Sequence, residues 1–312
     1  MIIDIAVPTY NCAPWIDAFM HSLLAQTYTT WRIVTRDDGS KDETVAKIAA
    51  WQQKLGDKIS ILPNPLGQNL GAVGNYNVIL AACQSNFVMQ GDPDDLWRAN
   101  KIALTLQIMH EACNQYGVAT PLIVCTDAEM VSENLELISR SFLKWTRMRS
   151  KTVSRLQSML MESPVLGATS IVNRPLLKMA LPLPAQAAAQ DWWLALVACA
   201  FGKIIFVDQP TISYRRHGSN DSLTPLTANG LRAITHVAQA RSRLSFLVDQ
   251  TVRQTQGFYE RFSAQLSNSE KDAVLIICNF RKLGPLAARL ALCRHGLQFS
   301  SWLKNIALFL FL

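Results

Sequence analysis

The chain has 312 residues, of which 49% are apolar, and a formal net charge of +7 at pH 7. This length suits one large α/β domain with a smaller appendage, because single cores stop growing at roughly 250 to 300 residues. The seven cysteines are an odd set without CxxC spacing, which excludes a disulfide-stapled scaffold and predicts a reducing, cytoplasmic location. The basic residues form no long runs and no nucleic-acid motif is found, so the charge favours anionic lipid or a diphosphate over nucleic acid.

Short apolar runs alternate with amphipathic stretches of helical length up to about residue 215, which predicts a mostly parallel sheet covered by helices. The predicted strands, in chain order, are 3–7, 31–35, 59–62, 87–90, 122–126, 204–207 and 212–215. The predicted helices are 14–26, with Asn11 as its cap, 42–55, a stretch ending at Gln84 after a loop over 63–74, 96–116 and 191–201. From residue 226 the pattern turns helical, so the expected units are a domain over 1–220 and a helical extension over 221–312.

Carboxylates follow the second predicted strand in the run Asp37-Asp38-Gly39-Ser40. In an open α/β sheet, ligands bind beyond the carboxyl ends of the strands. There the two acids could accept hydrogen bonds from a base or a ribose. An ordinary Asx turn followed by a helix cap explains the same run without a ligand.

A second acidic cluster, Asp92-Pro93-Asp94-Asp95, comes directly after the strand 87–90. Extended backbone would place the carboxylates of Asp92 and Asp94 on the same side, and two converging carboxylates need a cation. A divalent ion, Mn²⁺ or Mg²⁺, that bridges them to a diphosphate would neutralise a leaving group. The alternative is that acids at the start of a helix complement its dipole.

Asp191 and His217 are two further candidate site residues, one for a general base and one for a metal ligand. Asp191 opens an apolar run with Trp192 and Trp193, where burial would raise the pKa of the carboxyl and suit a general base. His217 could add an imidazole ligand to the metal. The alternatives are a helix cap next to core tryptophans, and a solvated loop histidine.

The ordered set of motifs over residues 3–220 resembles family-2 glycosyltransferases of the GT-A fold. The resemblance rests on Val7-Pro8-Thr9-Tyr10-Asn11, Gln26-Thr27, Asp37-Asp38-Gly39-Ser40, Asn69-Leu70-Gly71 with Asn75, and Asp92-Pro93-Asp94. It implies a mostly parallel, Rossmann-like α/β sheet that binds a nucleoside-diphosphate sugar. It also implies a nucleotide-binding group of Pro8, Thr9, Tyr10, Asn11, Asp38, Asn69 and Asp92, and a metal held by Asp92, Asp94 and His217.

Within that family, the chain most resembles bacterial rhamnosyltransferases of O-antigen or capsule synthesis. The motifs are Asp92-x-Asp94-Asp95-x-Trp97, Asp191-Trp192-Trp193 and Tyr214-Arg215-x-His217-Gly218. This likeness implies dTDP-L-rhamnose, or otherwise a UDP-sugar, as donor, and a glycan or polyprenol-linked acceptor. It implies an inverting mechanism in which Asp191 deprotonates the acceptor hydroxyl. The chain departs from the subgroup's pattern at Arg36, Pro93 and Gln190.

A loop over 163–169 would face the acceptor in this family, between the metal and Asp191. Gly167 would allow its backbone to approach a ligand closely, and Trp192 and Trp193 would be further acceptor-side residues. A plain connecting loop is the alternative.

Basic residues accumulate beyond Phe280 without an acidic counterweight, namely Arg281, Lys282, Arg289, Arg294 and Lys304. The terminal run 306–312 is apolar but too short for a bilayer, which needs roughly 20 residues. We therefore expect peripheral contact with the cytoplasmic face of the bacterial inner membrane. Packing on the domain or in a homodimer is the alternative.

Two other functions fit some of these motifs. A nucleotidyltransferase also needs paired carboxylates and a metal, but its Gly-rich, lysine-bearing triphosphate loop does not follow the first strand. A non-catalytic nucleotide-sugar or glycan-binding module would share the nucleotide-binding residues without using Asp191 as a base. The complete set of motifs favours the inverting glycosyltransferase.

Overall fold

A computed structural model of the chain describes residues 1–150, 155–218, 237–301 and 305–306. The strands are β1 (Ile3–Thr9), β2 (Trp31–Asp37), β3 (Ile59–Ile61), β4 (Phe87–Gln90), β5 (Leu96–Trp97), β6 (Leu122–Ser132), β7 (Leu137–Ser139), β8 (Ser170–Asn173) and β9 (Lys203–Arg216). The helices are α1 (Ile16–Leu24), α2 (Thr44–Leu55), α3 (Gly71–Ala82), α4 (Lys101–Tyr116), α5 (Phe142–Thr146), α6 (Leu156–Met161), α7 (Arg174–Ala180), α8 (Gln190–Phe201), α9 (Val237–Phe262), α10 (Asn268–Cys278) and α11 (Pro285–His295).

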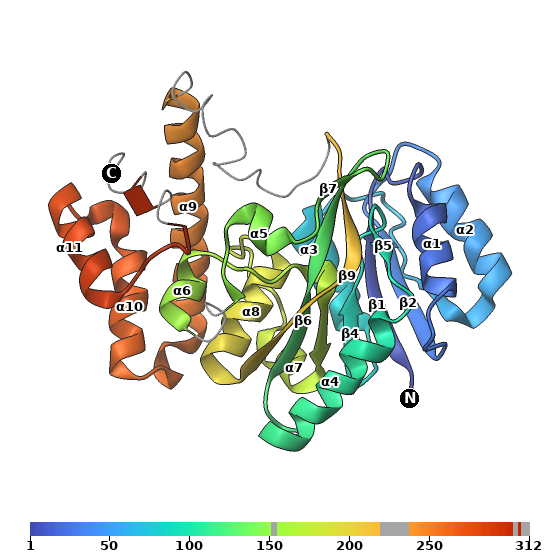
Figure 1. Cartoon of the computed structure of the whole chain (residues 1–312), viewed down its shortest axis with the longest axis horizontal. Coiled ribbons are helices and arrows are strands. Elements are labelled where there is room, and N and C mark those ends of the chain that lie inside the picture. The colour runs from blue at the N-terminus through green and yellow to red at the C-terminus, as the bar shows by residue number, and fades with distance from the viewer. Residues whose placement is uncertain (151–154, 219–236, 302–304, 307–312) are drawn as a thin grey trace.

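Within the described residues, the strands form one sheet in the order β3-β2-β1-β4-β8-β6-β9-β5, with β7 paired to β6 (Figure 1). The half containing β3, β2, β1 and β4 is parallel. The other half is mixed, because β8 runs antiparallel to both β4 and β6, while β9 runs parallel to β6. The predicted α/β class is confirmed, and the sheet has more antiparallel pairs than the sequence indicated.

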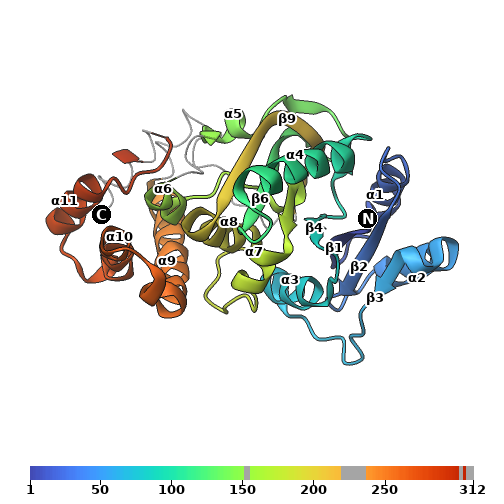
Figure 2. The same ribbon diagram turned by 90° about the horizontal axis from the view of Figure 1, so that it is seen from below.

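Each face of the sheet has its own apolar core, because successive side chains of a strand point to opposite faces. Ala6, Val88 and Val172 face the helices α3, α6, α7 and α8. Ile5, Met89 and Ile171 face α1, α2 and α4. Figure 2 shows α3 and α4 on opposite sides of the sheet. The carboxyl ends of β1, β2 and β4 lie between these two layers and carry the first group of predicted site residues.

Two predicted helix starts are wrong, each for a local reason. Leu96 and Trp97 pair with Ser213 and Ile212 as the short strand β5, so α4 begins only at Lys101. Asn11 does not cap α1, because its backbone has a positive φ of 46° and its side-chain oxygen accepts from the Lys41 N–H instead. The two strands predicted over 204–215 are one strand, β9, with an irregular register opposite Asp127.

The C-terminal helices α9, α10 and α11 lie at the end of the molecule opposite α1 and α2 (Figure 1). Phe258 and Phe262 of α9 pack against Trp193 of α8. The Arg261 guanidinium donates to four carbonyl groups at the end of α7, those of Met179, Ala180, Leu181 and Pro182. These contacts join α9 to the sheet domain through one continuous core.

The predicted unit boundary at 220/221, Lys304 and the apolar residues 307–312 lie outside the described residues. No helix in the described part of the chain has both the length and the apolar character that crossing a membrane requires.

Candidate functional site

The residues Asp37 to Ser40 form a tight turn after β2. The Asp37 carboxylate accepts from the N–H groups of Gly39 and Ser40 and from the Ser40 hydroxyl. Gly39 has a φ of +86°, and a Cβ there would lie 2.6 Å from the Gly67 carbonyl oxygen, so only glycine fits. Asp37 therefore forms the Asx turn that was the alternative interpretation of this run.

Asp38 lies beneath that turn in a buried polar network. Its Oδ1 lies 2.6 Å from Arg36 Nη1, and its carboxylate also accepts from the Leu70 and Gly71 N–H groups. Arg36, itself only 4% exposed, donates a second hydrogen bond to Asn75 Oδ1. Arg36 thus supplies the positive charge that Asp38 needs when buried, which gives a structural reason for the cation at residue 36.

The other predicted nucleotide-binding residues surround the same strand end and differ in exposure. Tyr10 is 52% exposed and Pro8 is partly exposed, so both have surface for a ligand. Thr9 is buried beside Asp37, its strand partner. Asn11 is held through its N–H by the Ser40 hydroxyl, and Asn69 is exposed with its side chain accepting from the Gly71 N–H.

Strand pairing brings Asp94 to His217, although 123 positions separate them in sequence. Residues 92–95 form a turn closed by the Asp95 N–H and the Asp92 carbonyl, so the extended backbone expected there is wrong. The pairing of β5 with β9 then places Asp94 Oδ2 2.8 Å from His217 Nε2. The imidazole of His217 stacks on Trp15, with the ring centroids 4.2 Å apart.

Tyr76 is a site residue that the sequence motifs did not indicate. It lies on α3 with only 2% exposure, and its hydroxyl donates to Asp92 Oδ1 over 2.7 Å. Burial raises the pKa of Tyr76 well above its usual range, and the carboxylates of Asp92, Asp191 and Asp94 add to the effect. One buried hydroxyl group thus contacts Asp92 and lies within electrostatic range of Asp94 and of Asp191, which is distant in sequence.

Asp191 lies in the first turn of α8, where two backbone N–H groups fix its carboxylate. Gly167 N–H donates to Oδ2 over 2.8 Å and Trp192 N–H donates to Oδ1 over 2.7 Å. Burial raises the pKa of Asp191, and these hydrogen bonds oppose that shift without cancelling it. A carboxyl with a raised pKa is suited to accept a proton.

Gly167 approaches Asp191 closely because it has no side chain. A Cβ on Gly167 would lie 3.1 Å from Gln90 Oε1 and 3.3 Å from Asp191 Cβ. Gly167 therefore lies between the end of β4 and the predicted base.

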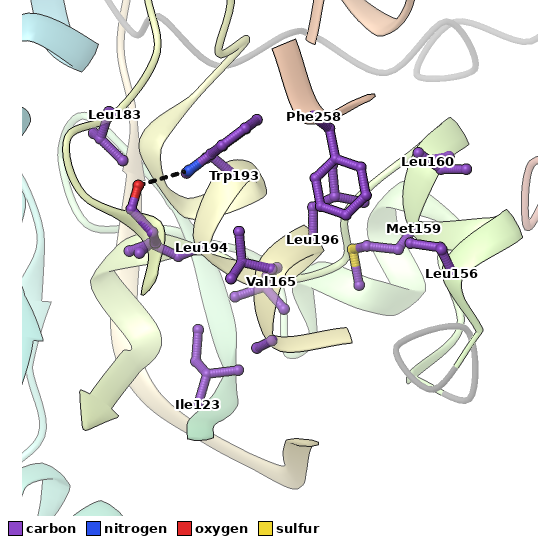
Figure 3. Close-up of a cluster of buried hydrophobic side chains, with 14 of the residues drawn as sticks. Ile123, Leu156, Met159, Leu160, Val165, Leu183, Trp193, Leu194, Leu196 and Phe258 are labelled. Atoms are coloured by element: carbon purple, nitrogen blue, oxygen red, sulfur yellow. Dashed lines mark hydrogen bonds between the residues drawn. The ribbon is translucent and has the colours of Figure 1, made fainter. Parts of the chain in front are cut away.

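The two tryptophans after Asp191 have different surroundings. Trp193 is fully buried among Phe258, Leu194 and Leu196, and its indole N–H donates to the Ala180 carbonyl (Figure 3). This corrects the acceptor-side expectation for Trp193, which is a core residue. Trp192 is partly exposed and donates its indole N–H to the Met159 carbonyl.

Asp94 and His217 are the pair that best fits a divalent cation. In the described residues, no three His, Cys, Asp or Glu side chains gather as a complete protein-made metal site. Mg²⁺ and similar ions in phosphate-binding sites commonly take one or two protein ligands and complete their shell with water and substrate oxygens. One carboxylate and one imidazole in contact match that need, while Asp92 is bonded to Tyr76.

Residues 4–160, which are 157 of the 312 residues, match the family described as Glycosyl transferase family 2. The UDP-Glc:alpha-D-GlcNAc-diphosphoundecaprenol beta-1,3-glucosyltransferase WfgD of Escherichia coli is 32% identical over 108 residues, 35% of this chain and 41% of that protein. The putative teichuronic acid biosynthesis glycosyltransferase TuaG of Bacillus subtilis is 30% identical over 110 residues, 35% of this chain and 42% of TuaG. The chain thus spans about two fifths of these relatives' lengths.

Two solved structures superimpose on nearly the whole chain. Staphylococcus aureus TarS 1-349 in complex with UDP-GlcNAc has a TM-score of 0.54 and 19% identity, covering 99% of this chain and 89% of that one. The mannosyltransferase PcManGT from Pyrobaculum calidifontis, in complex with GDP-Man and Mn²⁺, has a TM-score of 0.55 and 18% identity, covering 98% and 78%. At such identities the likeness concerns the fold alone, and it confirms the predicted GT-A fold.

Proposed function

Because the chain belongs to glycosyl transferase family 2 and is a glycosyltransferase, we propose that it transfers a sugar from a pyrimidine nucleoside diphosphate to a hydroxyl group with inversion. The observation that carries this proposal is that Gly167 lies between Asp191 and Gln90, the last residue of β4, directly before the turn with Asp92 and Asp94. A base on one side of a sugar and a charge-neutralising group on the other is what an in-line displacement requires.

In the proposed reaction, Asp191 takes the proton of the acceptor hydroxyl, and the acceptor oxygen forms a bond to the anomeric carbon. The bond from that carbon to the nucleoside diphosphate breaks, and its electron pair leaves with the diphosphate. Asp94 and His217 would hold a divalent ion, which when bound neutralises charge on the diphosphate. Gly167 N–H keeps Asp191 oriented toward the acceptor.

The donor side of the site would use the exposed Tyr10 and its neighbour Pro8 for the base, and Asn69 and Asp92 for polar contacts. The two donor classes proposed are dTDP-L-rhamnose, from the rhamnosyltransferase-like motifs, and UDP-sugars, which WfgD uses by name. The Asp38 carboxylate already accepts hydrogen bonds from Arg36 and from the Leu70 and Gly71 N–H groups. In this proposal Asp38 therefore supports the turn from beneath.

A donor screen tests the proposed activity. The protein is incubated with dTDP-L-rhamnose, UDP-glucose, UDP-GlcNAc or GDP-mannose, with MnCl₂ and a lipid-linked acetamido-sugar diphosphate, and free nucleoside diphosphate is measured. A dTDP- or UDP-sugar should release nucleotide faster when the acceptor is present. Nucleotide binding without release from any donor would instead support the non-catalytic binding module.

We further propose a glycan on a polyprenol diphosphate as acceptor in cell-surface polysaccharide synthesis, with the enzyme on the cytoplasmic face of the membrane. The acceptor named for WfgD is of this type. The exposed Leu286 and Leu290 lie on α11, whose last turn carries the exposed Arg294, and the exposed Lys282 precedes the helix. The sequence has no acid after Asp272, although Arg281 pairs with Asp249 of α9. Exposed apolar side chains on a segment with basic residues suit an anionic lipid surface.

Co-sedimentation with vesicles tests this membrane contact. Vesicles with phosphatidylglycerol should bind the protein at low salt, and Leu286→Glu with Leu290→Glu should reduce binding. Leu66→Glu, at a residue 79% exposed in the loop before α3, is the matched control. Vesicle binding equal to wild type in the double variant would contradict the membrane contact. So would a double variant that binds vesicles normally but loses a dimer seen by light scattering, because the surface would then be a subunit interface.

A further inference from the structure

Three buried polar atoms lie behind the turn that carries Asp94. They are Asp95 Oδ2, Trp97 Nε1 and Lys101 Nζ, and none has a hydrogen-bond partner among the described residues. Asp95 and Lys101 are fully buried, and Trp97 is 5% exposed. Buried polar groups without a partner are rare, and a buried amine or carboxylate without one is strongly unfavourable.

These three groups come from one short stretch of chain and lie close together. The Lys101 amine lies 4.6 Å from the centroid of the Trp97 indole ring. Burial lowers the pKa of Lys101 to about 7, and the carboxylate of Asp95 is the main charge that opposes this shift. An ordered water between them would accept from Trp97 and Lys101 and donate to Asp95, which gives it three partners.

Asp95 connects this buried group to the proposed metal ligands. Its Oδ1 accepts from the backbone N–H of Arg215 over 3.0 Å, and Arg215 Nε donates to the Asp94 carbonyl over 2.8 Å. These two bonds tie the turn to β9 just before His217. A group that fixes the Asp95 carboxylate therefore also fixes Asp94 relative to His217.

We propose that Lys101 is a positioning residue, which pairs with Asp95 through buried water and thereby holds Asp94 and His217 in register for the diphosphate-bound ion. This inference rests on the proposed function for its last step, the role of Asp94 and His217. Groups that orient metal ligands from behind commonly change metal affinity or activity by about 10- to 100-fold when removed.

A double-mutant cycle tests the pairing itself. Lys101→Met and Asp95→Asn keep the shape of each side chain, and the cycle measures thermal unfolding midpoints of wild type, both single variants and the double variant. Each single change leaves one buried group without its partner, so the double variant should melt above Lys101→Met. Additive losses would overturn the pairing, and this readout does not depend on any ligand.

Calorimetric binding of UDP, with and without MnCl₂, tests the positioning. Lys101→Met should reduce the gain in UDP affinity that Mn²⁺ provides by about tenfold and leave metal-free binding unchanged, and the double variant, which also lacks the pair, should show a reduced gain as well. Lys47→Met, which removes a half-exposed lysine paired with Asp17, is the control and should behave as wild type.

An unchanged Mn²⁺-dependent gain in folded Lys101→Met would overturn the positioning role. If Lys101→Met does not fold, the double variant decides, because it lacks Lys101 without leaving an acid at residue 95 unpaired. A reduced Mn²⁺-dependent gain would support the positioning role, and a gain equal to that of wild type would overturn it. A wild type without any Mn²⁺-dependent UDP binding would overturn the proposed function and the positioning role together, while the melting cycle still decides the pairing.

Discussion

The backbone N–H of Gly167 donates to Asp191 Oδ2 over 2.8 Å, and this approach depends on the absence of a side chain at residue 167. The contact holds the proposed base beside the end of β4, where the turn bearing Asp92 and Asp94 begins. There is little room for a side chain at residue 167, because a Cβ there would lie within 3.3 Å of three side chains.

Gly167→Ala should therefore reduce kcat by about 10- to 100-fold, since displacing a catalytic group by about 1 Å can cost that much. The added methyl would lie 3.2 Å from Gln190 Nε2 and 3.3 Å from Asp191 Cβ, on the acceptor side of the site. The KM for the donor should change less than about threefold, because donor contacts lie elsewhere. Gly284→Ala, where a Cβ meets nothing within 4 Å, is the control. A normal kcat for Gly167→Ala would show that the close approach is not required.

The pH dependence of kcat/KM should report the state of Asp191. Burial raises the pKa of this carboxyl, and it works as a base only when deprotonated. Activity should therefore be constant at neutral pH and fall as the pH decreases through a value above the ordinary range of aspartic acid. A profile measured at saturating MnCl₂ that stays flat down to pH 4 would contradict this assignment.

His217→Ala and Asp94→Asn should each raise the MnCl₂ concentration for half-maximal activity by about tenfold or more. The two side chains are in contact at 2.8 Å, so the effects should not add in the double variant. His110→Ala removes an exposed histidine that packs edge-on against Phe87, at the other end of β4, and serves as control. If both variants need the same MnCl₂ concentration for half-maximal activity as wild type, Asp94 and His217 do not bind the metal.

Arg36→Met should lower the free energy of unfolding by about 3 to 5 kcal/mol, because it leaves Asp38 as a buried charge without its cation. Arg36 and Asp38 are 4% and 3% exposed, and their atoms are 2.6 Å apart. Arg36→Met combined with Asp38→Asn should recover part of the loss. In urea unfolding, Lys47→Met should lose less than about 1 kcal/mol, since its ion pair with Asp17 is partly exposed to solvent. A loss that small for Arg36→Met would show that the network is not stabilising.

The strand ends and their carboxylates were predictable because they depend on local patterns. β1, β2 and β4 are marked by short apolar runs, Asp37 and Asp92 come after two of these runs, and Asp191 opens an apolar run of helical length. The antiparallel strand β8 and the short strand β5 were missed because each is short and depends on pairing with strands distant in sequence.

The individual contacts of the site could not be predicted for the same reason. Tyr76 reads as one more apolar position of α3, and only the fold places its hydroxyl next to Asp92. Trp193 sits beside the proposed base in sequence, but the helical turn directs it into the core against Phe258. Arg36 looked like a departure from the family pattern, and its role became evident from its contact with Asp38.

Asp191→Asn is the most direct test of the central claim, that this carboxylate is the base of a sugar transfer. Nucleoside diphosphate release is measured with the donor identified in the screen and a lipid-linked acceptor, alongside UDP binding by calorimetry. We predict that turnover falls by about 10² to 10⁴ while nucleotide affinity stays within about threefold of wild type. Turnover at the wild-type rate in Asp191→Asn would contradict the claim.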